Sequence, residues 1–115
     1  MLNSSNNDNY YYQKELNPKI SFIIPVFNKM KFLSICIKSI QNQSFKEIEL
    51  IIIDDHSADN SIKIIEKFKK VDRRIYLIKN RKNMGTLYSR YIGSINSKGS
   101  YFFLLILMIV YLKIS

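Results

Sequence analysis

The stretch Leu50-Ile51-Ile52-Ile53-Asp54-Asp55-His56-Ser57-Ala58-Asp59 decides the fold. Its four consecutive aliphatic residues predict a strand over 48–53 that is buried on both faces, which is typical of a central strand in a parallel sheet. The polar residues that follow predict a turn, with Asp59 as the N-cap of a helix. A strand that runs through a short turn into a helix is the repeating unit of an α/β protein.

The sequence before this stretch contains the same unit. An apolar run over 20–24 predicts a first strand that Pro25 ends, and Asn28 is placed to cap a helix over about 29–42. The apolar positions of that helix recur every three or four residues and form one stripe: Leu33, Ile37 and Ile40.

The sequence after the stretch repeats the unit. We expect a helix after Asp59, a third strand over 74–78, a third helix over 86–97 and a fourth apolar strand from Tyr101. The resulting order βαβαβαβ has short connections, and short connections between these elements require a parallel sheet with helices packed on it.

Charge is distributed unevenly along the 115 residues. The net charge is +9, and all nine acidic residues lie at or before Asp72, so residues 73–115 contain no carboxylate. The one cysteine, Cys36, excludes an internal disulfide and is expected to be a small buried residue. The one histidine excludes a multi-histidine zinc site. Because the lysines are scattered rather than clustered, we expect no nucleic-acid partner.

The two ends of the sequence differ from its middle. Residues 1–18 are polar and Asn-rich, and we expect them to be a disordered lead-in without a secretory signal. Residues 101–112 carry no charge, but they are shorter than the roughly 20 residues of a membrane span. We therefore expect a buried strand or part of a span there, followed by an apolar tail over 105–115. The sequence does not distinguish the cytoplasm from the cytoplasmic face of a membrane.

Ligands of an open parallel sheet bind beyond the carboxyl ends of its strands. Here these ends are residues 25–28, 54–57 and 80–85. Asp54 and Asp55 are the only adjacent acids, and successive strand residues point to opposite sides. We expect one carboxylate to face the ligand and the other to anchor its loop. The alternative is that both only cap the next helix.

Glycine-rich phosphate motifs are missing from the sequence. Neither G-x-G-x-x-G nor G-x-x-x-x-G-K-[ST] occurs among its three glycines. A phosphate group would therefore need side-chain donors, for which Arg90 and Lys82 are candidates.

Several motifs in the same order resemble the family 2 inverting glycosyltransferases. The similar stretches are 19–28 (KISFIIPVFN), 33–44, 49–61 (ELIIIDDHSADNS) and 83–102. The resemblance covers about residues 19–104. It implies an α/β fold that is the nucleotide-binding half of a GT-A (Rossmann-like) glycosyltransferase domain. The implied function is to bind a nucleotide-diphospho-sugar, of UDP type, for transfer of the sugar to an acceptor hydroxyl.

The resemblance also implies the site residues. Pro25 and Phe27 would line the nucleotide pocket, with Phe27 against the base and Asn28 nearby. Asp55 would accept a hydrogen bond from the N3–H of a uridine-type base. Three further residues would lie near the diphosphate and the nucleotide sugar: Asn83, Gly85 and Arg90.

The sequence departs from the family at the metal motif. After the strand that begins near Tyr101, the family carries an Asp-x-Asp type motif that holds Mg²⁺ or Mn²⁺, but residues 106–109 here are Ile-Leu-Met-Ile. A hard divalent cation needs oxygen ligands. We therefore expect no retained metal and no catalytic residue in this chain, although intact relatives use Mg²⁺ or Mn²⁺. The family's acceptor-binding half also has no counterpart here, so we expect no turnover by this chain alone.

Other interpretations of the second half stay open. Its basic residues and the apolar segment 101–112 suit a non-catalytic module that is held at a membrane or docked on a partner. A second alternative is a shifted reading frame, because the codons of Met108-Ile109 contain GAT, an Asp codon, in another frame. A third is a remnant whose last strand is an aggregation-prone edge.

Overall fold

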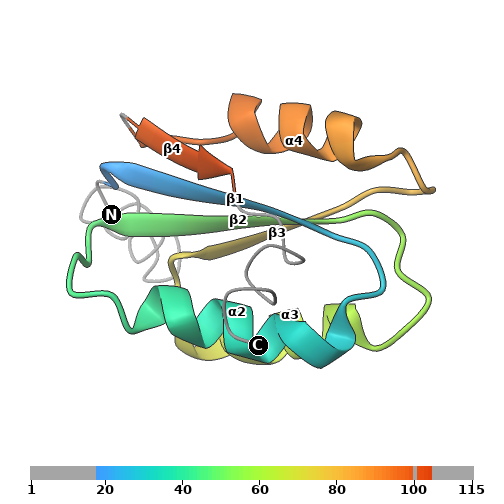
Figure 1. The fold of residues 1–115 in the computed structure, drawn as a ribbon, viewed down its shortest axis with the longest axis horizontal. Coiled ribbons are helices and arrows are strands. Elements are labelled where there is room, and N and C mark those ends of the chain that lie inside the picture. The colour runs from blue at the N-terminus through green and yellow to red at the C-terminus, as the bar shows by residue number, and fades with distance from the viewer. Residues whose placement is uncertain (1–17, 100, 105–115) are drawn as a thin grey trace, which may run out of the picture.

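The computed structural model describes residues 18–99 and 101–104. Strands and helices alternate in these residues as β1 (Ile20–Val26), α2 (Met30–Gln41), β2 (Ile48–Asp54), α3 (Ser61–Val71), β3 (Ile75–Lys79), α4 (Thr86–Ile95) and β4 (Tyr101–Leu104). The strands form one sheet in the order β3-β2-β1-β4, and every pairing is parallel. Helices α2 and α3 cover one face of the sheet and α4 covers the other (Figure 1). The predicted βαβαβαβ order is confirmed.

Strand β2 is buried along its whole length because it pairs with β1 and β3 and has helices on both faces. Leu50 and Ile52 belong to the core beneath α2 and α3, whereas Ile51 and Ile53 belong to the smaller core beneath α4. This alternation explains why the sequence shows an unbroken aliphatic run rather than an alternating pattern.

The predicted stripe of α2 is confirmed, because Leu33, Ile37 and Ile40 are all buried. Cys36 lies in the same core and is fully buried. Burial raises the pKa of its thiol to about 12. Cys36 is therefore a small apolar core residue, as predicted, and not a nucleophile.

The first strand extends further than predicted, so Pro25 lies inside β1, opposite Ile53. Strand residues direct their backbone groups alternately to the two neighbouring strands. Because the Val26 carbonyl accepts from the Asp55 N–H of the β2 side, Pro25 directs its backbone to the other edge. The described residues of β4 pair only with Ile20–Ile23 there. The missing N–H of Pro25 thus costs no hydrogen bond with β2.

The predicted helix caps were wrong, since Lys29 and Asn60 occupy the N-cap positions of α2 and α3. Asp59 instead accepts hydrogen bonds from the first residues of both helices. Its Oδ1 accepts from the backbone N–H and the hydroxyl of Ser61, and its Oδ2 accepts from the Met30 N–H at 3.2 Å. A local capping rule does not foresee this contact, because it joins two separate helix starts.

Helix α4 packs very closely on the sheet at Gly93. A Cβ atom at this position would overlap Ile23 Cγ2 and come within 2.7 Å of Ile53 Cδ1. Only glycine therefore lets the helix lie at this distance from β1 and β2. The helix ends at Ile95, two residues before the predicted end.

A buried carboxylate joins the chain segments at the amino ends of the strands. Glu49 is 2% exposed, and its Oε2 accepts from the Ser21 hydroxyl and the Lys98 N–H. The Ser21 oxygen in turn accepts from the Gly99 N–H at 2.9 Å. These hydrogen bonds hold the connection between α4 and β4 against β1 and β2, and they fix where β4 begins.

Parts of the sequence-based expectations lie outside the described residues. These are the lead-in, apart from Pro18, the tail over 105–115 and the metal-motif positions 106–109. Among the described residues, none of the helices has the length and apolar character that crossing a membrane requires.

Candidate functional site

The carboxyl ends of β1, β2 and β3 meet at one edge of the sheet, where the loops into the next helices begin (Figure 1). The Asp55 N–H donates to the Val26 carbonyl, and the Asn80 N–H donates to the Asp54 carbonyl. The three predicted strand ends are therefore side by side.

Asp55 fixes the loop that leads from β3 to α4. Its Oδ1 accepts from the Asn80 side-chain amide at 2.9 Å and from the Met84 N–H at 2.6 Å, and its Oδ2 accepts from the Gly85 N–H at 2.8 Å. The same Asn80 amide donates to the Ser89 hydroxyl on α4. Gly85 has a φ of 94°, which favours glycine, so the loop has one conformation that presents two backbone donors to Asp55.

These contacts keep Asp55 ionised. Burial opposes ionisation, but the hydrogen bonds from Met84, Asn80 and Gly85 and the neighbouring His56 outweigh it, so the pKa of Asp55 lies below its usual 3.8. A carboxylate offers about four lone-pair positions. Donors from the described residues use three of them, two on Oδ1 and one on Oδ2.

Asp54 accepts a hydrogen bond from the loop that follows β2. Its Oδ2 accepts from the Ser57 N–H at 2.9 Å, while its Oδ1 is buried without a hydrogen-bond partner in the described part of the chain. The two carboxylates accept hydrogen bonds from different loops, and both anchor a loop. That one of them also faces a ligand stays a prediction. The alternative that both cap α3 is wrong, because among the described residues the hydrogen-bond partners of the two carboxylates lie in the loops after β2 and β3 and not in α3.

The loops after β1 and β2 are joined through Asn28. Its Oδ1 accepts from the Ala58 N–H at 2.8 Å, and its N–H donates to the Ser57 hydroxyl. Asn28 and His56 have φ values of 52° and 66°, a left-handed conformation that is uncommon outside glycine. Strained backbone of this kind gathers at functional sites. Phe27, at the tip of the first loop, leaves 44% of its surface exposed.

Arg90 is the one charged residue of α4 and lies in the middle of the helix. Arg90 lies three residues before Gly93 and so shares the helix face that is directed at the sheet. Its Nε is buried and has no hydrogen-bond partner among the described residues. The N-terminus of α4, four residues before Arg90, carries a partial positive charge. An anionic group would satisfy this unpaired donor.

The structure brings five of the predicted site residues to one edge: Pro25, Phe27, Asn28, Asp55 and Gly85. Arg90 lies further along, in the middle of α4. Asn83 lies exposed on the loop of Gly85, but the hydrogen bonds that anchor the loop to Asp55 come from other residues. Sequence reasoning missed Asn80 and Ser89. The available signal for Asn80 was its place as the first polar residue after β3.

The described residues do not fit a divalent metal. No group of three His, Cys, Asp or Glu side chains among them is arranged to hold a metal ion. Residues 73–115 contain no carboxylate, so the last strand supplies no oxygen ligands from acidic side chains.

We expect the free energy of unfolding to fall as the pH drops below about 4. In Asp55, Asp59 and Asp72, burial opposes ionisation but hydrogen bonds to the carboxylate outweigh it and lower the pKa below 3.8. Since the unfolded chain then binds more protons, this stability is present above the unfolded pKa and is lost as the pH falls through the folded values. Thermal unfolding across a pH series checks this.

The matched controls for the pH series are single variants. Asp72→Asn should weaken the acid dependence, because Asp72 accepts hydrogen bonds from Gln41 and Arg74. Glu66→Gln, at an exposed position of α3, should leave it unchanged. An unfolding temperature that stays constant through the acid range would contradict the expectation.

Comparison with known proteins identifies relatives of the whole described region. The model of the family "Glycosyl transferase family 2" matches residues 21–105. A GalNAc(5)-diNAcBac-PP-undecaprenol beta-1,3-glucosyltransferase of Campylobacter jejuni is 44% identical over 64 residues, which is 56% of this chain and 21% of the relative. An uncharacterised glycosyltransferase of Haemophilus influenzae is 43% identical over 84 residues, which is 73% of this chain and 34% of the relative. The chain thus spans about a fifth to a third of these relatives.

Solved structures show the same fold. Residues 1–349 of TarS from S. aureus, in complex with UDP, match with a TM-score of 0.72 and 24% identity over 76% of this chain and 27% of that one. The mannosyltransferase PcManGT from Pyrobaculum calidifontis, in complex with GDP-Man and Mn²⁺, matches with a TM-score of 0.65 and 13% identity over 79% of this chain and 31% of that one. The fold is the Rossmann-like GT-A fold, as predicted.

The parallel sheet, the polar edge at its carboxyl ends and the family match agree on one assignment. The family model covers most of the chain, from the first strand to the end of the last described one. The chain therefore belongs to glycosyl transferase family 2.

Proposed function

We propose that the carboxyl edge of the sheet binds the nucleotide of a nucleotide-diphospho-sugar of UDP type. Phe27 packs against the base, Pro25 and Asn28 form the wall beside it, and Asp55 accepts a hydrogen bond from the N3–H of uracil. The observation that carries the proposal is Asp55, a buried and ionised carboxylate with about four lone-pair positions, of which donors from the described residues use three.

The diphosphate lies toward α4 in this proposal. The unpaired Nε of Arg90 and the N-terminus of α4 provide positive charge, and the Asn83–Gly85 segment leads into the helix. That TarS, which shares the fold, forms a complex with UDP supports a uridine nucleotide as the ligand.

In this proposal the sugar of the bound donor is transferred to an acceptor hydroxyl. The names of two relatives given above, a glucosyltransferase and a mannosyltransferase, support sugar transfer. We propose that this chain alone does not complete the transfer, because its residues 73–115 offer no carboxylate to hold the metal that one relative binds. Incubation of the purified chain with UDP-sugars and Mn²⁺ tests this, and measured sugar transfer would overturn it.

Calorimetric titration with UDP and with CDP tests the nucleotide site. Uracil presents an N3–H donor to Asp55, whereas the cytosine N3 is an acceptor and leaves the carboxylate facing a lone pair. A hydrogen bond to a charged group contributes about 1.5–3 kcal/mol, so UDP should bind at least about tenfold more tightly than CDP. Addition of Mn²⁺ should leave the affinity unchanged. Equal affinities for the two nucleotides, or no binding of UDP, would refute the proposed base contact.

A further inference from the structure

The outer face of α4 carries an apolar stripe. Leu87, Tyr91 and Ile95 are spaced by four residues and leave 79%, 60% and 59% of their surfaces exposed. Outward positions of a helix on a globular protein are normally polar. No acidic residue occurs in α4. The buried residues of α4 are the small Ser89 and Gly93, whereas its large apolar side chains Leu87, Tyr91 and Ile95 are exposed.

Basic residues border this stripe. A cavity of about 530 Å³ lies between α4 and the end of β3, and its lining joins the apolar side chains of Ile78, Tyr88 and Ile92 to exposed cations at the end of β3 and in the loop that follows it. These cations are Lys79, Arg81 and Lys82.

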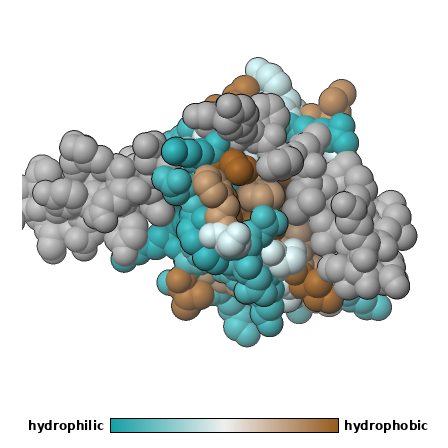
Figure 2. All heavy atoms as spheres, turned by 60° about the vertical axis from the view of Figure 1, so that its left-hand side comes forward, coloured by the Kyte–Doolittle hydropathy of each residue, from teal (hydrophilic) through white to brown (hydrophobic). Residues whose placement is uncertain are grey.

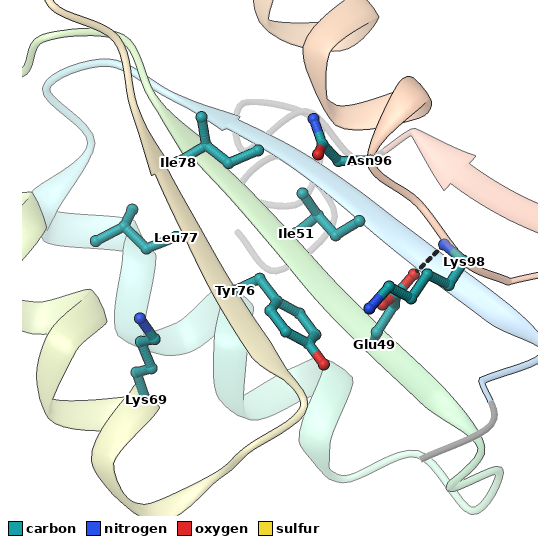
Figure 3. A pocket seen from close by; sticks show the side chains of 8 residues that line it. All are labelled: Glu49, Ile51, Lys69, Tyr76, Leu77, Ile78, Asn96 and Lys98. Atoms are coloured by element: carbon teal, nitrogen blue, oxygen red, sulfur yellow. Dashed lines mark hydrogen bonds between the residues drawn. The ribbon is translucent and has the colours of Figure 1, made fainter. Parts of the chain in front are cut away.

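A second cavity continues the same surface toward the amino ends of the strands. It measures about 250 Å³, shares Ile78 with the first and is also lined by Tyr76, Lys69 and Lys98 (Figure 3). The ammonium group of Lys98 lies 5.7 Å from the centre of the Tyr76 ring. Viewed from the side at which the strands begin, the described surface is mostly hydrophilic with a small group of hydrophobic residues between (Figure 2).

We name the α4-side residues of these three features the basic–apolar face: the stripe Leu87, Tyr91 and Ile95, the apolar residues Tyr76, Ile78, Tyr88 and Ile92, and the cations Lys79, Arg81, Lys82 and Lys98. Lys69 reaches the second cavity from α3 and is not counted in the face. The one acid in the cavity linings is Glu49, which is 2% exposed and accepts internal hydrogen bonds. The face is therefore strongly positive and partly aliphatic.

We propose that the basic–apolar face docks on an anionic lipid bilayer. Cations near a bilayer surface are attracted to anionic headgroups, while Leu, Ile and Tyr side chains enter the boundary between headgroups and acyl chains. A second copy of the chain is a poorer occupant, because each copy carries a net charge of +9 and the faces would repel. A nucleic acid would leave the aliphatic side chains of Leu87 and Ile95 without a partner.

The docking does not depend on the proposed nucleotide site. It also differs from anchoring through residues 101–112, since the face consists of residues between Tyr76 and Lys98 and lies on the α4 side of the sheet (Figure 1). A chain held in this way would lie on the membrane surface.

Sedimentation of the full chain with vesicles tests the proposal. We expect binding to vesicles that contain phosphatidylglycerol, weaker binding at high salt and little binding to pure phosphatidylcholine. The variant Arg81→Ala/Lys82→Ala should lower the partition coefficient about 30-fold. The variant Leu87→Ser/Ile95→Ser should lower it about tenfold or more. The circular dichroism of each variant confirms that it is folded.

Matched controls lie on α3, which covers the other face of the sheet (Figure 1). Lys63→Ala/Lys67→Ala removes two exposed cations, and Val71→Ser removes an apolar side chain that is 83% exposed. Both should bind vesicles as the parent chain does. Equal effects of the α3 and α4 variants, equal binding to neutral vesicles, a dimer in light scattering that Leu87→Ser/Ile95→Ser dissociates, or single-stranded DNA binding lost in Arg81→Ala/Lys82→Ala would each overturn the proposal.

Discussion

Replacing Asp55 with alanine is expected to weaken UDP binding by about 10- to 100-fold, because it removes a charged acceptor that contributes about 1.5–3 kcal/mol. The same change leaves the Met84 and Gly85 N–H groups and the Asn80 amide without their acceptor. We therefore also expect a loss of about 2 kcal/mol in the free energy of unfolding. Calorimetry with UDP and urea denaturation measure the two effects separately.

Asp72→Ala distinguishes loss of a ligand contact from loss of stability. Asp72 also accepts several hydrogen bonds, from Gln41 and Arg74, but it follows the last residue of α3, at the amino end of β3. This variant should lose stability and keep its affinity for UDP. An Asp55→Ala chain that binds UDP as tightly as the parent would show that Asp55 only anchors the loop.

Replacing Gly93 with valine is expected to destabilise the fold by about 3 kcal/mol, the upper range for overpacking of a core. The new Cβ would overlap Ile23 and come within 2.7 Å of Ile53, and both residues belong to the core beneath α4. Helix α4 would have to move away from β1 and β2. For a domain whose total stability is about 5–15 kcal/mol, this is a large fraction.

Urea denaturation of Gly93→Val and Ser94→Val measures the effect at neighbouring positions. Ser94 is partly exposed, so the same branched side chain meets less of the core there. We expect Ser94→Val to cost well under half as much as Gly93→Val. Equal denaturation midpoints for the two variants would mean that α4 does not rest on the sheet at Gly93.

Much of the fold could be predicted from local patterns. The aliphatic run of β2 and the stripe of α2 come from periodicity alone, and both are buried as expected. The predictions were wrong where the role of a residue depends on a contact with a segment that is distant in the sequence. Asp59 resembles an N-cap in sequence but binds the start of α2 as well, and Pro25 is tolerated in β1 because of which strands lie beside it.

For the candidate site too, the position of a residue could be predicted from the sequence but its distant hydrogen-bond partners could not. The place of Asp55 at the carboxyl edge follows from a strand that ends in acids. Its partners Asn80, Met84 and Gly85 are 25 to 30 residues away in the chain, and only the crossover through α3 and β3 brings them within reach. The sequence could predict that the loop after β3 lies at the edge of the sheet where ligands bind, but it could not predict the hydrogen bonds from this loop to Asp55.

The strand order has a consequence for synthesis of the chain. β1 is made first, yet it lies between β2 and β4, and β4 is the last of the described strands to be made. During translation, the edge of β1 that pairs with β4 therefore stays unpaired while the residues between Asp54 and Tyr101 are added. An unpaired apolar edge is open to pairing with other nascent chains. The nascent protein is therefore most vulnerable in the interval before β4 leaves the ribosome.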